Sequence, residues 1–257
     1  MARVGENLLA SRIRSGGRAH WIGFFGAMVL GWALLFSTAI PADLRSFEAI
    51  YGTSLVELLC GGGLGATGFA ATFAMWALMS AAMMAPTALP AVATYDDLST
   101  LTATGFARLT GGYLTAWIGF SALAAGAQVA LFELGPVGGL GQNLSVPLTM
   151  ALLIGAGAYQ FSALKHAGLS RGRAPLNFLM QHRDEGPVRN GLRLGLDCVG
   201  GGWALMLLGF VGGTMNLGFM GLAMVLMTLE KRPDIGRYLT RPLGAILIAS
   251  GLMFPLF

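Results

Sequence analysis

Long apolar runs alternate with short polar segments along most of the chain. Seven runs reach or approach the roughly 20 residues that a helix needs to cross the hydrocarbon core of a bilayer. They cover about residues 20–41, 66–90, 109–132, 147–165, 193–211, 214–230 and 241–257. The apolar stretch 193–230 is divided at Gly212-Gly213-Thr214, because one helix of that length would exceed a single crossing. The pattern predicts an all-α, polytopic bundle of six to seven transmembrane helices, forming one integral membrane domain over residues 1–257.

The composition supports a membrane environment. Hydrophobic residues make up 55% of the chain and charged residues 11%, with a mean hydropathy of +0.68. Because a soluble domain carries roughly a quarter charged residues, this chain cannot cover itself with a polar surface. The 39 glycines suit closely packed membrane helices. The lipid bilayer is therefore the first expected partner.

The basic residues predict an orientation. With the N-terminus in the cytoplasm and alternating crossings, every lysine and arginine except Arg45 falls on the cytoplasmic side, as the positive-inside rule requires. The apolar run 20–41 is too long for a signal-peptide core and is interpreted as an uncleaved signal-anchor. Residues 1–19 then form a basic cytoplasmic segment, and 166–192 a basic cytoplasmic loop in which Pro175 begins a short interfacial helix. These basic segments are interpreted as lipid-facing, and no nucleic-acid partner is expected.

Methionine is concentrated in the second apolar run. Met75, Met79 and Met83 share one helical stripe, and Met84 lies further round. Thioethers are soft ligands suited to Cu(I), and they also fill irregular gaps in helix packing. Both interpretations stay open for these side chains.

Further candidate ligands lie towards the predicted cytoplasmic ends of neighbouring spans. The full candidate metal set is Met75, Met79, Met83, Met84, Cys198, Asp197, His166, Met215 and Met220. Supporting or structural roles are expected for Tyr159, Gln160, Lys165, Arg193, Asn216 and Glu230. Each ligand has a plainer alternative: Asp197 can pair with Arg193 four residues earlier, and His166 can cap a helix. Ionisable groups at membrane depth are costly, which favours a function for at least some of them.

The chain lacks the motifs of several enzyme classes. It has two cysteines, no CxxC pair, no P-loop, no dinucleotide fingerprint and no recognisable Ser/His/Asp site. An ATP-driven or hydrolytic enzyme is therefore not expected.

Four stretches resemble a bacterial family of unknown function described as predicted metal-binding integral membrane proteins. They are MWALMSAAMMAPTALP, YQFSALKHAGLSRGRAP, CVGGGWALMLLGFVGGTMNLGFM and LEK, within residues 66–231. The resemblance implies cysteines where this chain has Gly168, Gly172, Gly201 and Gly202; of the pattern, Cys198 remains.

Three functions follow as hypotheses. The first is binding of Cu(I) through methionines in the bacterial cytoplasmic (inner) membrane, with copper as the cofactor or cargo. The second is a non-catalytic accessory subunit of a larger membrane complex. The third is a small-molecule or proton-coupled transporter that uses Asp197.

Overall fold

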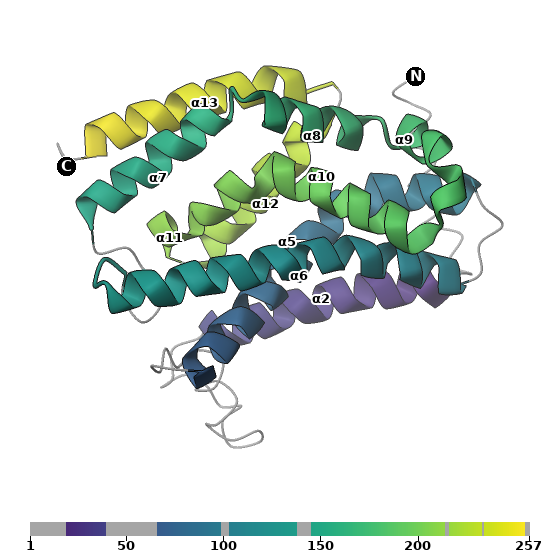
Figure 1. Ribbon diagram of the computed structural model, residues 1–257, viewed down its shortest axis with the longest axis horizontal. Coiled ribbons are helices and arrows are strands. Elements are labelled where there is room, and N and C mark those ends of the chain that lie inside the picture. The colour runs from purple at the N-terminus through teal and green to yellow at the C-terminus, as the bar shows by residue number, and fades with distance from the viewer. Residues whose placement is uncertain are drawn as a thin grey trace.

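The computed structural model describes residues 19–39, 66–98, 103–137, 145–213, 216–232 and 234–254 (Figure 1). These residues form helices and no strand, which confirms the all-α class for this part of the chain. The helices are α2 (Ala19–Ala39), α5 (Ala66–Leu98), α6 (Ala103–Glu133), α7 (Val146–Tyr159), α8 (Ala163–Arg173), α9 (Pro175–Gln181), the 3-10 turn η2 (Arg183–Glu185), α10 (Pro187–Leu207), α11 (Gly209–Gly212), α12 (Leu217–Glu230) and α13 (Gly236–Met253).

The described residues of each predicted span are largely helical, although the helices differ in length. Three described helical stretches are long and apolar enough to cross a membrane: Gly68–Asp96, Thr104–Glu133 and Pro187–Gly212. His20–Phe36, Leu217–Glu230 and Tyr238–Met253 are apolar but shorter. These lengths are consistent with a membrane protein, while the seven crossings and the cytoplasmic N-terminus stay predictions.

The fourth predicted span is not one helix. α7 ends at Tyr159 and α8 starts at Ala163, with an angle of 59° between them. Ser162 causes the restart, because its extended backbone and its side chain, which accepts from the Lys165 amide at 3.2 Å, form an N-cap. α8 then continues to Arg173, so the loop expected to begin at residue 166 starts as helix.

Helices α6 and α10 pack backbone to backbone along much of their length (Figure 1). A Cβ on Gly112 would overlap the Val188 carbonyl oxygen, and one on Gly191 would overlap that of Leu109. A Cβ on Gly195 would lie 2.6 Å from the Tyr113 carbonyl oxygen. Small residues therefore fix this contact, as in other closely packed membrane helices. The contact brings the Tyr113 turn of α6 against the central part of α10.

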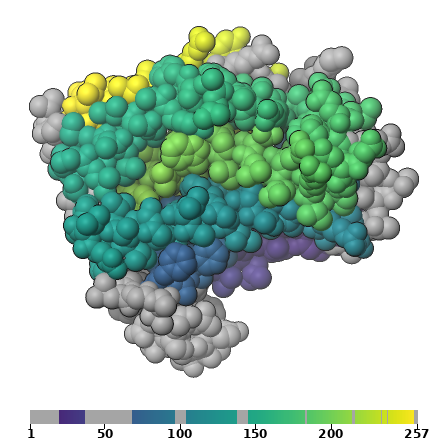
Figure 2. All heavy atoms as spheres, in the orientation of Figure 1, coloured from purple at the N-terminus to yellow at the C-terminus, as the bar shows by residue number. Residues whose placement is uncertain are grey.

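The interior is built around α10 and α12. These two helices lie between α6 on one side and the α7–α8 pair on the other, and their atoms are visible between those bands in Figure 2. α5 crosses behind them and contacts both α6 and α12. Four methionines of α5 and two of α12 belong to the same buried apolar cluster as Cys198.

Candidate metal centre

Cys198 on α10 is the polar centre of the helix bundle. Its side chain is buried, and the sulfur accepts a hydrogen bond from the Tyr113 hydroxyl at 3.0 Å. The Lys231 ammonium donates to the same sulfur at 2.9 Å and to the Thr87 hydroxyl at 2.9 Å. Thr87 Oγ1 also lies 3.0 Å from the Tyr113 oxygen. Residues from α5, α6, α10 and the end of α12 thus meet at one thiol.

A small cavity adjoins this sulfur. It has a volume of about 10 Å³ and is lined by Met84, Leu169, Cys198, Gly201, Gly202, Met227, Glu230 and Lys231. A cavity of roughly 10–15 Å³ holds one water-sized particle. Three of the lining residues carry sulfur, and they come from α5, α10 and α12. The residues around this single-atom space therefore include one thiol and two thioether side chains.

Glu230 is the carboxylate among the residues that line the cavity. Its Oε2 accepts from the Lys165 ammonium at 2.7 Å, and both side chains are 1% exposed. Its Oε1 is buried and has no hydrogen-bond partner among the described residues. Arg173 donates two hydrogen bonds to the Glu230 carbonyl oxygen, at 2.9 and 2.7 Å, and so satisfies the C-terminal end of α12. A buried oxygen without a partner usually signals a missing ligand, water or ion.

The chemistry of these donors fits a soft metal ion. In the part of the chain that the structure describes, no three His, Cys, Asp or Glu side chains converge on one point. A site of the tetrahedral zinc type is therefore not built by those residues. Thiolate with thioethers is instead a donor set that suits Cu(I).

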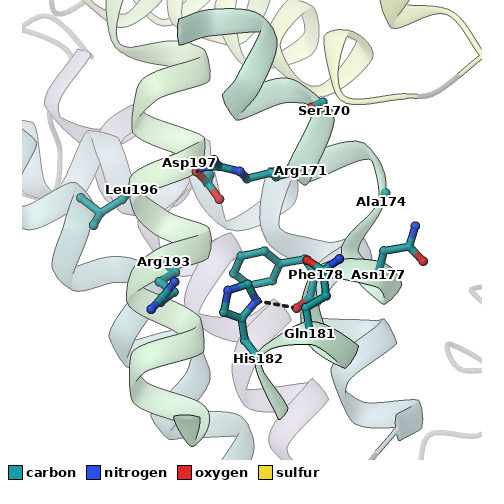
Figure 3. A pocket seen from close by; sticks show the side chains of 10 residues that line it. All are labelled: Ser170, Arg171, Ala174, Asn177, Phe178, Gln181, His182, Arg193, Leu196 and Asp197. Carbon is teal, nitrogen blue, oxygen red and sulfur yellow. Dashed lines mark hydrogen bonds and ion pairs between the residues drawn. The ribbon is translucent and has the colours of Figure 1, made fainter. Parts of the chain in front are cut away.

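Asp197 and Arg193 do not form the pair expected from their i, i+4 spacing. Arg171 of α8 binds the Asp197 carboxylate at 2.7 Å, as Figure 3 shows. Arg193 binds Glu185 of the η2 turn at 2.8 Å. The predicted Asp197–Arg193 pair is therefore wrong. Each of the two side chains binds a partner from a neighbouring segment instead. Asp197 lines a separate cavity of about 600 Å³ bounded by α8, α9 and α10 (Figure 3).

Of the four candidate methionines on α5, Met84 lines the small cavity, and the three that share the stripe do not. Met75, Met79 and Met83 are buried in the surrounding apolar cluster, and so is Met220 of α12. Met215 lies outside the described residues.

The remaining predicted residues take different positions. His166 is exposed on α8 and does not line the small cavity. The Tyr159 hydroxyl donates to the Gly200 carbonyl oxygen at 2.6 Å, Gln160 is fully buried, and Asn216 caps α12 by accepting from the Phe219 amide.

Four residues at the centre were not selected from the sequence as site residues: Thr87, Tyr113, Met227 and Lys231. From the sequence, Lys231 was interpreted as a topology charge and, with Glu230, as part of an interfacial ion pair, because it follows the last apolar turn of a predicted span. Tyr113 could have been selected from the sequence, because it is a hydroxyl-bearing side chain directly after Gly111-Gly112 within an apolar run. Its partner on α10 is 85 positions away, a separation that local patterns do not reveal.

The sequence model of one protein family matches residues 73–254, and its description is PpoB2, copper chaperone. No curated protein matches the chain. No solved structure matches it either. The matched region begins just before Met75 and contains every residue that lines the small cavity. Because the match covers more than two thirds of the chain, this protein belongs to the PpoB2 copper chaperone family.

Proposed function

We propose that this protein binds Cu(I) inside a multi-pass helix bundle of the bacterial cytoplasmic membrane, on the sulfurs of Met84, Cys198 and Met227. The observation that carries the proposal is the cavity of about 10 Å³ whose lining residues include one thiol and two thioether side chains from three helices. Its volume suits one ion, and its donors suit a soft one. Membership of a copper chaperone family agrees with this cargo.

Each neighbouring group has a role in this proposal. The thiolate is the metal-binding form of cysteine. The Tyr113 hydroxyl, which donates to the Cys198 sulfur, holds that sulfur in place. Lys165 balances the charge of Glu230, so that the cavity wall carries no uncompensated carboxylate. Gly201 and Gly202 leave the wall free of side chains beside the sulfurs.

The methionines beyond the cavity suggest a route for the ion. Met220 and Met224 precede Met227 on α12, as Met75 and Met79 precede Met84 on α5. In the predicted topology both helices run from the outside to the cytoplasm, and they contact each other. At about 1.5 Å per residue, the thioethers of α5 extend roughly 14 Å from the cavity towards the exterior. We assign the metal's path to this side of the bundle.

Elemental analysis of the detergent-purified protein tests the proposal. After expression with added copper, the unmodified protein should hold about one copper per chain. Cys198→Ser and the double variant Met84→Leu/Met227→Leu should hold little. The matched control is Met83→Leu, which changes an equally buried methionine that neither lines the cavity nor was placed on the route, and it should retain copper. Equal copper in all four proteins would contradict the site.

The accessory-subunit hypothesis gives the opposite result. If the unmodified protein holds no copper with or without supplementation and copurifies with a stable membrane partner, the copper proposal fails and the scaffold function replaces it.

A further inference from the structure

Lys231 occupies an unusual position for a residue beside a metal site. Its ammonium donates at 2.9 Å to the Cys198 sulfur and at 2.9 Å to Thr87 Oγ1, and a longer contact of 3.4 Å reaches the Thr87 carbonyl oxygen. The same side chain lines the cavity together with both thioethers. A positive charge thus stands in contact with the one thiol among the described cavity-lining residues.

Glu230 is already matched by Lys165 at 2.7 Å. The Lys231 ammonium lies 2.9 Å from the Cys198 sulfur and adds a positive charge that no carboxylate among the described cavity-lining residues matches. Asp197 lines a different cavity and is matched by Arg171. Among the described cavity-lining residues, there is no carboxylate besides Glu230 that could balance the second positive charge of a divalent ion. Uncompensated charge is expensive in a buried site.

We infer that Lys231 is the residue that makes this a site for a monovalent soft metal ion, a deepening that rests on the proposed function. Cu(I) would form a bond to the Cys198 sulfur, the S–H bond would break with release of its proton to solvent, and the hydrogen bond from Lys231 to that sulfur would be lost. The ammonium keeps its charge and its hydrogen bond to Thr87, no electron is transferred, and the copper stays monovalent. The copper–thiolate unit is then neutral beside the ammonium. A divalent ion of the same softness would give a unit with one positive charge, which the ammonium beside it repels.

The selectivity is tested with Ag(I) and Cd(II), a monovalent and a divalent soft ion, on the full chain carrying Cys60→Ser so that Cys198 is its one cysteine. Bound metal is measured after equilibration with both ions. The protein with Lys231, and Lys231→Arg, should bind Ag(I) and exclude Cd(II). Lys231→Gln removes the charge and should lower the Ag(I)-to-Cd(II) ratio at least tenfold. A ratio unchanged within twofold would overturn the inference, whereas failure of the Lys231 protein to bind Ag(I) would instead overturn the proposed function.

Displacement of Lys231 is tested without any substitution at that position. The chain contains two lysines, Lys165 and Lys231, so acylation of each by an amine-reactive reagent is readily followed by mass spectrometry. Ag(I) loading should raise the labelling of Lys231 several-fold, because its ammonium leaves the sulfur. Lys165, which is 1% exposed and bound to Glu230, serves as the internal control and should stay unlabelled. Labelling of Lys231 that does not change on loading contradicts the exchange.

Discussion

At the residue scale, the centre depends on long-range contacts to a single sulfur. Cys198 binds donors from Tyr113 and Lys231, which are 85 and 33 positions away in the sequence. The candidate list from the sequence contained Cys198 and Met84 because sulfur at membrane depth is recognisable by type. The sequence grouped Asp197 and His166 with these two residues because it gives the depth of a residue along a helix and not the side to which its side chain points. Rotation about the helix axis separates them: Asp197 faces α8, while Cys198, the next residue, faces Tyr113.

Removing the Tyr113 hydroxyl should weaken copper binding without unfolding the protein. Tyr113→Phe deletes one hydrogen bond to the Cys198 sulfur, and a hydrogen bond of this kind contributes about 0.5–1.5 kcal/mol. Copper affinity, measured by competition with a Cu(I) chelator, should fall by roughly threefold to tenfold. Tyr159→Phe is the matched control, because that hydroxyl binds the Gly200 carbonyl oxygen instead, and it should leave the affinity unchanged.

Breaking the buried Lys165–Glu230 pair should destabilise the protein strongly. Lys165→Met leaves the Glu230 carboxylate buried and unmatched, and loss of one partner of such a pair costs about 3–5 kcal/mol. The double variant Lys165→Met/Glu230→Gln carries no unmatched charge and should recover most of the thermal stability in detergent. Equal midpoints for the single and double variants would show that the charge balance does not matter.

At the element scale, glycines decide where the helices meet. The length and apolar character of the helices were predictable, since about 20 apolar residues are needed for a crossing and few other patterns produce such runs. Which helices pair was not predictable, because the 39 glycines offer many small-residue faces and the sequence does not say which face meets which helix. Gly112, Gly191 and Gly195 hold α6 against α10, whereas a Cβ on Gly200 would meet no neighbour within 4 Å. The bend between α7 and α8 was not predicted either, because the apolar average over residues 147–165 hides the helix N-cap at Ser162.

A methyl group at Gly195 should disturb both stability and the centre. Gly195→Ala places a Cβ about 2.6 Å from the Tyr113 carbonyl oxygen, which forces α6 and α10 apart beside Cys198. Overpacking of this kind costs about 1–3 kcal/mol, so both thermal stability and copper affinity should fall. Gly200→Ala, one helical turn and a half further on, has open space and should be neutral or slightly stabilising. Similar behaviour of the two variants would contradict the helix contact.

At the scale of the whole molecule, the predicted topology joins the site to a direction across the membrane. Fifteen of the sixteen basic residues fall on the cytoplasmic side in the seven-span interpretation. The structure bends the fourth span by 59°, so α7 and α8 form either one broken crossing or a re-entrant pair. The two arrangements place the C-terminus on opposite sides of the membrane.

Reporter fusions to the C-terminus distinguish these arrangements. With the N-terminus in the cytoplasm and seven crossings, a C-terminal alkaline phosphatase should be active and a C-terminal green fluorescent protein dark. A fluorescent C-terminus would show an even number of crossings and make α7–α8 re-entrant. A fusion after residue 185, in the predicted cytoplasmic loop, provides the internal reference and should fluoresce in the seven-span arrangement.

X-ray absorption at the copper edge tests the central claim most directly. The copper-loaded protein should show Cu(I) with sulfur scatterers alone in its first shell, and the sulfur number should fall in Met84→Leu/Met227→Leu. A first shell of nitrogen or oxygen, or copper that stays sulfur-bound and unchanged when Cys198 is replaced by serine, would contradict a metal centre at the meeting point of α5, α10 and α12.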